Sequence, residues 1–403
     1  MESLNIMIRY FKIFIVNNLC KYLSLQTVYD DTISLMKDVL LFIKSNFTFY
    51  KFMVFIVFVM LFTTLHFWYQ WSHDVRVPKI LKSIDFYPEY VNIEPLKSLK
   101  DYLKNPKKYK LCDWYICSSY KPYLPGYSYD DYCSSKAIEI LLRSGVRYLE
   151  LEVFTDNSIN NEPIVTVGTE KGNWHNTLNN LSFKECCEII RNIAFSGSII
   201  TNSDDPLFLY LNIKVNNNTK TLDKIADILY KTFDDKLLGK KYSYHRKNVS
   251  IEPIYKLMKK IVIISNNIYE KCKLSELINI SSDGPFVRRL ESKTVLQTYE
   301  PQELTDFNRL NMTIVYPSDD SKTPSNFNPE IPWYYGCQFV CMNFKNLDNN
   351  MSKYMEKFRY QSFSLKPENL RYTPLTYKAP KKQNPDLHYN ALQMKTSFYD
   401  YKI

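Results

Sequence analysis

A run of apolar residues from Phe52 to Trp71 constrains this chain more than any other feature of its sequence. No charged residue occurs between Phe52 and Leu65, and the apolar character continues through aromatic residues to Trp71. About 20 such residues in a helix cross the roughly 30 Å hydrocarbon core of a bilayer. The run therefore predicts one transmembrane helix, assigned to residues 47–72, with residues 52–71 in contact with lipid.

The alternative for this run is a buried helix of a soluble domain. The run is not amphipathic, however, and it stands apart from the folded region that follows. It also lies far from the N-terminus and lacks a small-residue cleavage site, which argues against a cleaved signal peptide. Basic residues flank it equally on both sides, so the positive-inside rule gives no orientation. We expect a single-pass membrane protein of undecided topology.

The residues on either side of the span carry weaker signals. Residues 1–46 contain two amphipathic stretches, which either lie in a membrane interface or pack on each other or on a partner. Residues 73–106 are polar with scattered prolines and predict a connector.

From residue 107 the pattern changes, because short apolar runs begin to alternate with stretches of helical periodicity. The apolar runs are "VRYLELEVF", "EPIVTVG", "PLFLYLNIKV", "KKIVIIS" and "GCQFVCMNF", and the helical ones include "SFKECCEIIRNIAF" and "TLDKIADILYKTF". Such alternation indicates a parallel sheet covered by helices. We predict an α/β fold, a TIM-like (β/α)8 barrel over residues 107–372, with its working residues at the carboxyl ends of the strands. A tail, residues 373–403, follows.

Charge and cysteine content add limited constraints. The net charge of +10 favours anionic partners such as lipid head groups. It equally fits a solvated, lysine-rich surface. We predict no nucleic-acid partner. The nine cysteines form no zinc-site spacing. Free thiols are the default expectation, and a Cys112–Cys117 or Cys117–Cys133 bridge stays open.

Residues 107–372 resemble the catalytic barrel of the eukaryotic phosphoinositide-specific phospholipases C, in both its X and its Y half. In the X half the matching stretches include "SSYKPYL" and "CSSKAIEILLRSGVRYLELEVF". In the Y half they include "PSNFNPEIPWYYGCQFVCMNFKNLD" and "FSLKPENLR", which are the most specific. The resemblance covers about two thirds of the chain.

This resemblance implies a site that cleaves a phosphodiester with the inositol's own hydroxyl, two histidines for proton transfer, and a Ca²⁺ ion. At the place of the first histidine stands Tyr120, followed by Lys121 where a calcium-ligating asparagine is expected. Val167 takes the place of the second histidine. The acidic pair that would hold calcium is kept as Glu150 and Glu152.

Other positions of the family site also differ. Asn212 stands where a third acid is expected, Ser265 and Asn267 where lysines would hold the substrate, and Ile314 where an arginine is expected. We therefore expect no cofactor, with the Ca²⁺ site lost. We also expect six of these side chains to converge at the barrel mouth, with Lys121 paired to one acid: Tyr120, Lys121, Glu150, Glu152, Val167 and Asn212.

These substitutions predict that the chain is not an enzyme. The resulting hypothesis is a membrane-anchored, catalytically inactive phospholipase C-like protein that serves as a structural or binding module with protein partners. Its resemblance to virion membrane proteins of large DNA viruses implies a barrel that bridges a virion membrane to a protein shell. Two alternatives stay open, a phosphoinositide head-group binder and a phosphodiesterase of altered mechanism. For the latter, His175 in the loop after Val167 is a candidate substitute base.

Overall fold

The structure, a computed structural model, describes residues 34, 37–38, 49–84, 92–127, 131–156, 160–169, 175–215, 218–244, 247–318, 325–374 and 393–402. The chain divides into two units, residues 1–372 and residues 373–403, and each is described by itself. The amphipathic stretches expected in residues 1–46 lie outside the described residues, apart from three helical positions.

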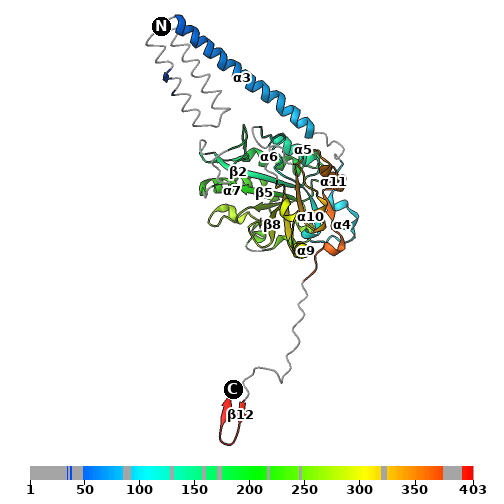
Figure 1. Cartoon of the computed structure of the whole chain (residues 1–403). Helices are drawn as coiled ribbons and strands as arrows, with labels where there is room; N and C mark the ends of the chain where they lie inside the picture. Colours follow the sequence, from blue (N-terminus) through cyan, green and yellow to red (C-terminus); the bar gives the residue numbers. More distant parts are fainter. Residues whose placement is uncertain are drawn as a thin grey trace. The chain divides into compact units, whose positions relative to one another are not determined.

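Eight parallel strands form a nearly closed barrel in the first unit (Figure 1), in the order β7-β6-β5-β2-β1-β10-β9-β8. The predicted (β/α)8 fold is therefore confirmed. The barrel strands are β1 (Trp114–Ser119), β2 (Tyr148–Asp156), β5 (Leu207–Ile213), β6 (Ile261–Ser265), β7 (Ile280–Ser281), β8 (Val287–Glu291), β9 (Met312–Tyr316) and β10 (Phe339–Met342).

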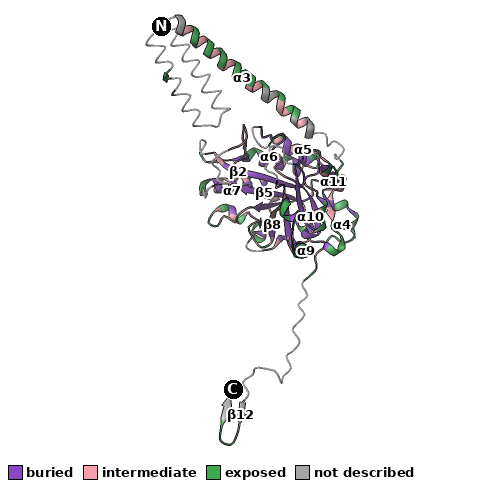
Figure 2. Ribbon diagram, viewed as in Figure 1, coloured by how far each residue is buried: buried purple, intermediate pink, exposed green. Residues whose placement is uncertain are grey.

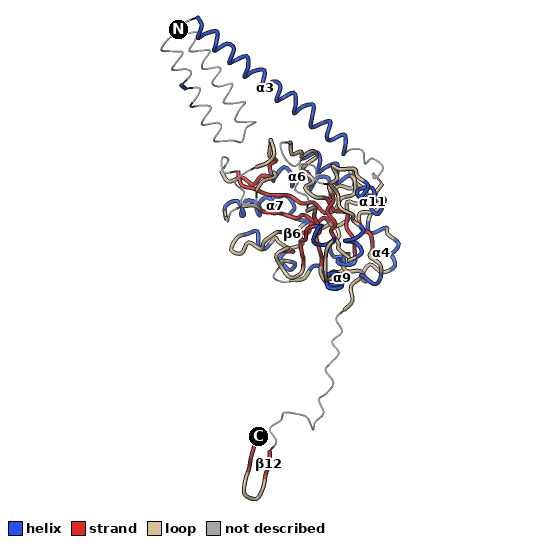
Figure 3. Tube along the Cα trace, in the orientation of Figure 1, coloured by secondary structure: helices blue, strands red, loops and turns tan. Residues whose placement is uncertain are grey.

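Helices surround these strands, as the tube view in Figure 3 shows. Two of them begin at side chains that cap the helix: Asn218 accepts from the Thr221 amide and Asp348 from the Met351 amide. The helices are α4 (Lys100–Lys104), α5 (Ser135–Arg143), α6 (Phe183–Ala194), α7 (Thr219–Phe233), α8 (Ser292–Leu296), α9 (Pro301–Leu310), α10 (Glu330–Tyr334) and α11 (Asn349–Phe358).

Three short strands pair antiparallel outside the barrel order. β3 (Glu162–Val165) pairs with β2, β4 (Leu181–Ser182) with β3, and β11 (Phe363–Leu365) with β1. The expectation that "EPIVTVG" contributes a parallel strand is wrong for β3. Only a few residues separate β2 from β3, whereas a parallel crossover needs a dozen or more.

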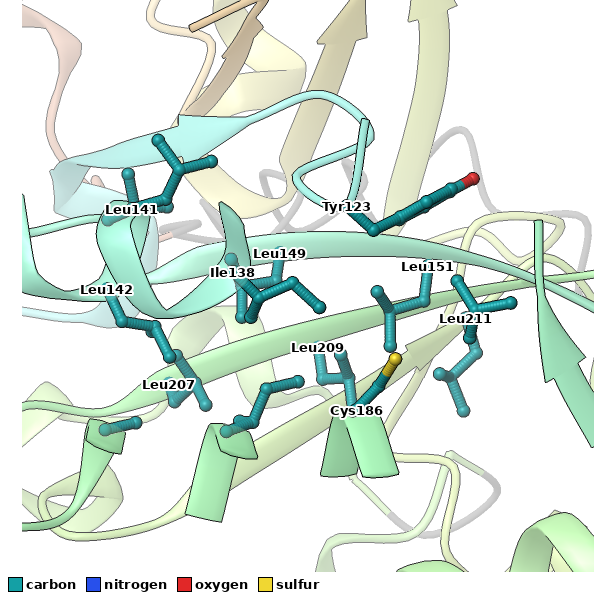
Figure 4. Packing of buried hydrophobic residues seen from close by; sticks show 14 of the residues in the cluster. Tyr123, Ile138, Leu141, Leu142, Leu149, Leu151, Cys186, Leu207, Leu209 and Leu211 are labelled. Atoms are coloured by element: carbon teal, nitrogen blue, oxygen red, sulfur yellow. The ribbon is translucent and has the colours of Figure 1, made fainter. Parts of the chain in front are cut away.

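The core has two layers, one on each side of the barrel wall. Alternate residues of β2, such as Leu149 and Leu151, face outward into a cluster shared with the helices. Figure 4 shows leucines of β2 and β5 meeting α5 and α6. The other face of the strands, including Tyr148, fills the barrel interior. Figure 2 shows how fully β2 and β5 are buried. Inner-face side chains at alternate positions after Tyr148 therefore lie closer and closer to the carboxyl end of the barrel, which we call its mouth.

Helix α3 (Phe49–Ile84) contains the apolar run. Within it, residues 52–79 include a window of mean hydropathy 2.0 that is not buried, so the helix is long and apolar enough to cross a membrane. The prediction that the helix ends at residue 72 is wrong, because the helix continues through Pro78 to Ile84. Loss of apolar character ends a membrane span but not a helix, since arginine and lysine are good helix formers.

The remainder of the predicted connector also differs from expectation. Leu96 is fully buried, and its amide donates to the Asp205 carboxylate at 2.8 Å, so this segment packs on the barrel. In the second unit, β12 (Gln393–Lys395) and β13 (Asp400–Lys402) form a hairpin. The eight cysteines of the described residues are free thiols, so neither bridge left open by the sequence forms.

Candidate functional site

Three neighbouring strands bring most of the predicted site residues to one end of the barrel. β1 is followed directly by Tyr120 and Lys121, β2 carries Glu150 and Glu152, and β5 carries Asn212. β2 and β5 pair in parallel with Glu152 opposite Asn212. Because parallel strands of a barrel end at the same rim, these residues gather at its carboxyl end.

The expected ion pair between Lys121 and one of the two acids is present. The Lys121 Nζ lies 3.1 Å from the Glu152 Oε1, and both side chains are largely buried. The Asn212 amide donates to the same oxygen at 3.4 Å. The turn after β1 places Lys121 at a φ of 44°, a conformation that side-chain-bearing residues seldom adopt.

The second acid has a partner that the sequence reasoning missed. Arg289 of β8 donates to the Glu150 Oε1 at 2.7 Å, and the Glu150 side chain is fully buried. A sequence signal for it existed in "VRRLE". Val287 faces the barrel interior, and strand alternation places Arg289 on the same face. Arg288 faces outward and pairs with Glu303.

Aromatic rings enclose the Arg289 guanidinium. It lies 3.7 Å from the centre of the Tyr316 ring and 5.3 Å from that of Tyr210. Tyr120 stacks on Tyr316 with ring centres 6.3 Å apart, and the Lys121 Nζ lies 5.1 Å from the Tyr120 ring centre. The mouth therefore holds two cations, two carboxylates and a stack of tyrosines.

Burial and charge together set the protonation states. Burial raises the pKa of Glu150, which the Arg289 guanidinium opposes. Burial works to lower the pKa of Lys121, but attraction to Glu152 and neighbouring groups outweighs it and raises that pKa. Burial also raises the pKa of the Tyr120 hydroxyl. At neutral pH, Lys121, Arg289 and Tyr120 all carry their protons and can act only as donors to an anion.

A small cavity lies beside Tyr120 and Lys121, with Leu124 and with Leu141 of α5 in its lining rather than the two mouth carboxylates. Its volume is about 10 Å³, which is room for about one water molecule, and Lys345 also lines it. Burial lowers the pKa of Lys345 to about 8, and the charge of Lys121 acts in the same direction.

The other predicted positions do not face the mouth interior in the same way. Val167 belongs to the cluster between the sheet and the helices rather than to the interior cluster. Ser265 follows Ile264, which faces inward, so alternation turns Ser265 outward, and its hydroxyl donates to the Asn266 side chain. The amide of Asn267 donates to the Ser265 hydroxyl at 3.5 Å. Ile314 is fully buried in the barrel interior.

His175 lies near the inner face of β2. Its ring packs edge-on against Phe154, with ring centres 5.3 Å apart, and it forms a backbone bridge with Gly168. Phe154 follows Glu150 and Glu152 at alternate positions of the same strand. Burial lowers the pKa of His175, so its imidazole is neutral at pH 7. A neutral imidazole can accept a proton.

Across the part of the chain that the structure describes, no group of three or more His, Cys, Asp or Glu side chains is placed to hold a metal ion. Each of the two mouth carboxylates instead has a cation at hydrogen-bonding distance through its Oε1. In both residues the Oε2 is buried without a hydrogen-bond partner among the described residues.

Comparison with protein families matches residues 107–267 to "Phosphatidylinositol-specific phospholipase C, X domain". Residues 278–369 match "Phosphatidylinositol-specific phospholipase C, Y domain". The two matches fall on the barrel, and the boundary between them lies between β6 and β7.

Curated relatives match over shorter stretches. The chain is 33% identical over 86 residues to 1-phosphatidylinositol 4,5-bisphosphate phosphodiesterase beta-1 of Bos taurus, covering 20% of this chain and 7% of that protein. It is 37% identical over 81 residues to 1-phosphatidylinositol 4,5-bisphosphate phosphodiesterase classes I and II of Drosophila melanogaster, covering 19% and 6%. The chain thus spans less than a tenth of either relative's length.

Solved structures show the same fold. The crystal structure of L. pealei PLC21 superposes with a TM-score of 0.56 at 23% identity, covering 70% of this chain and 40% of that one. S. officinalis PLC21 gives a TM-score of 0.55 at 22% identity, covering 66% and 38%.

These comparisons overturn the prediction that the chain is not an enzyme. The relatives are named phosphodiesterases, and both halves of their catalytic region match this chain. The prediction judged Tyr120 and Val167 position by position. That reasoning missed Arg289, because it could not see which cation the closed barrel brings to Glu150.

Proposed function

Because the chain belongs to the phosphatidylinositol-specific phospholipase C family, we propose that it is a membrane-anchored phosphodiesterase of altered mechanism, acting on phosphodiester head groups of phosphoinositide lipids. In this proposal, protonated side chains take the place of a divalent cation. The observation that carries it is the pairing of each mouth carboxylate with a cation, Lys121 with Glu152 and Arg289 with Glu150.

The paired cations argue against a Ca²⁺ ion at this site. Ca²⁺ prefers six to eight oxygen ligands and depends on carboxylates that are free to bind it. Here the Oε1 of each acid already faces an ammonium or a guanidinium group. The same two cations supply fixed positive charge in a largely buried setting, where electrostatic stabilisation of a developing phosphate charge is strong. No step of the proposed reaction runs through a metal.

Proton transfer falls to groups outside the expected motif. The neutral imidazole of His175 accepts the proton of the inositol hydroxyl that attacks phosphorus. The Tyr120 hydroxyl, which keeps its proton at neutral pH, donates to the oxygen of the leaving diacylglycerol as the phosphorus–oxygen bond breaks.

The anchor supports a membrane substrate. Helix α3 continues beyond its apolar run, and Arg76 near its end pairs with Asp131 at 3.3 Å, in the segment that follows β1. That segment leads from the strand end that carries Tyr120. A location in a virion membrane, with the barrel bridging to a protein shell, stays a prediction of the resemblance, and cross-linking mass spectrometry on purified particles would check it.

The test uses the full chain reconstituted in vesicles that contain phosphatidylinositol and its phosphates. Release of water-soluble inositol phosphate is expected with a chelator present as well as with Ca²⁺. His175→Ala should lower the rate by about 100-fold or more, as loss of a general base does. His66→Ala, in α3, is the matched control and should leave the rate unchanged. Release that requires Ca²⁺, or that is indifferent to His175, contradicts the mechanism.

A lipid head-group receptor is the second candidate, favoured by the donors at the mouth. Vesicle co-sedimentation separates the two. Phosphoinositide-dependent binding that Lys121→Met weakens, without release of inositol phosphate from any lipid, supports the receptor and rejects the phosphodiesterase.

A further inference from the structure

A second cavity, of about 980 Å³, lies at the opposite end of the barrel strands from Tyr120. It is bounded by one face of α9 from Pro301 to Arg309, by α10 and by Lys357 of α11. Residues between 365 and 371, from the end of β11 onward, complete the lining. Tyr115 marks its floor at the start of β1, and the Tyr115 hydroxyl donates to the Trp333 carbonyl at 2.6 Å. The cavity shares no lining residue with the small cavity at the mouth.

The lining of this cavity carries an excess of positive charge. Four basic side chains line it and one acidic side chain does, and the acidic one, Glu330, already pairs with Lys353 at 2.7 Å. The basic residues are Arg309, Lys357, Lys366 and Arg371. The size of the cavity matches sites that take organic ligands of about 300–1,000 Å³.

Two of the lysines have no carboxylate partner within 4.0 Å among the residues that the structure describes. Lys357 is half-buried, and its ammonium lies 4.4 Å from the Trp333 ring centre and 5.0 Å from that of Tyr115. Lys366 is fully buried and donates to the Asn308 carbonyl at 3.1 Å. A buried ammonium group without a counter-ion costs free energy, which an anion in the cavity would offset.

Burial acts on both lysines in the same sense. It lowers the pKa of Lys357, against the attraction of Glu330. It lowers the pKa of Lys366 to about 8. An anion beside them would therefore be expected to stabilise their protonated forms.

Flat aromatic surface lies next to these cations. Trp333 forms part of the wall, and Tyr334 at the rim is 76% exposed. An exposed aromatic ring such as Tyr334 beside cations suits a ligand that joins an anionic group to a planar body.

We propose that this cavity is a binding site for an organic anion, with a phosphate or carboxylate group against Lys357 and a planar body against Tyr334. Lys366, behind the wall, contributes its positive field rather than a direct contact. The site is separate from the proposed phosphodiesterase site.

The test uses pyridoxal 5′-phosphate, a planar aldehyde that carries phosphate, on the full chain in detergent. A lysine amine condenses with the aldehyde with loss of water, and borohydride reduces the imine to a stable secondary amine. Peptide mass spectrometry then locates the label. We expect Lys357 to be labelled at a concentration about tenfold lower than exposed lysines, because anion binding concentrates the probe there.

Two variants on the same helix give a matched pair. Lys357→Met should abolish the selective label, whereas Lys353→Met, one turn earlier and facing Glu330, should leave it unchanged. Tyr334→Ala should weaken selective labelling of Lys357 by pyridoxal phosphate but not the protection that inorganic phosphate gives. Because Tyr334 and Lys353 are exposed, these changes leave the core intact.

Competition identifies the anionic group. Inorganic phosphate that protects Lys357 while citrate does not indicates a phosphate ligand, and the reverse indicates a carboxylate. Either result supports the site. Labelling of Lys357 no faster than Lys353, or labelling that neither anion slows, overturns it. None of these measurements depends on hydrolysis at the mouth.

Discussion

Replacing Arg289 with methionine tests whether the mouth rests on buried ion pairs. The change removes the guanidinium 2.7 Å from the fully buried Glu150 and leaves that carboxylate without its partner. Breaking one side of a buried pair costs about 3–5 kcal/mol. Loss of the contact with the Tyr316 ring, at 3.7 Å, adds about 1 kcal/mol. We therefore expect Arg289→Met to lower the free energy of unfolding by about 4–6 kcal/mol at pH 8.

The loss should depend on pH in a defined direction. Without Arg289, the already raised pKa of Glu150 rises further, because burial and the charge of Glu152 are then opposed mainly by Lys121. The folded variant then binds a proton that the unfolded chain does not hold. Its stability relative to the parent chain must therefore increase as pH falls from 8 to 5.

Urea unfolding of the full chain in detergent, followed by tryptophan fluorescence at pH 5 and pH 8, measures these effects. The double variant Glu150→Gln/Arg289→Met removes both charges and should recover all but about 1–2 kcal/mol. Arg288→Met is the matched control on the same strand. Its exposed pair with Glu303 is worth at most about 1 kcal/mol.

The reasoning fails if Arg289→Met is no more destabilising than Arg288→Met. It also fails if the double variant is as unstable as the single one, because the cost then comes from lost packing rather than from an unpaired charge.

Three further outcomes are expected. Burial raises the pKa of Asp205 to about 7, so the folded chain holds a proton that the unfolded chain releases near pH 4. The free energy of unfolding should therefore fall as pH rises from about 4 to 7. Asp205→Asn should flatten that slope in urea titrations. Gly145→Ala should destabilise the fold by about 1–3 kcal/mol, because φ at Gly145 is 91° and the new methyl would lie 2.9 Å from the Ile93 Cγ1. Gly239→Ala is the control, since Gly239 has a φ of 77° but nothing lies within 4 Å of the new methyl. Thermal melts of both variants separate the backbone cost from the steric cost. Removal of residues 1–84 should leave a folded barrel in the supernatant after ultracentrifugation without detergent, whereas a pelleted barrel would show that further surfaces hold the membrane.

The alternation of apolar runs and amphipathic stretches was sufficient to predict the barrel. The largely apolar run of β2, which is buried on both faces, and the helical periodicity of α6 are local properties of the sequence. The apolar run of α3 is equally local, since the length and hydropathy of a helix need no tertiary contact. The antiparallel strand β3 was misjudged, because an apolar run has the same composition in either direction of pairing.

The site depended on tertiary structure. The motif positions around Tyr120 and Glu150 were readable along the chain, and the like charges of Glu150 and Glu152 were enough to predict a pair with Lys121. Arg289 lies 139 positions from Glu150 in sequence, and only closure of the barrel brings β8 across from β2. The same closure brings Tyr115, Trp333 and Lys357 around one cavity. Sequence patterns record which face of each element is buried, but the neighbour that a buried charge meets is decided by how distant elements pack.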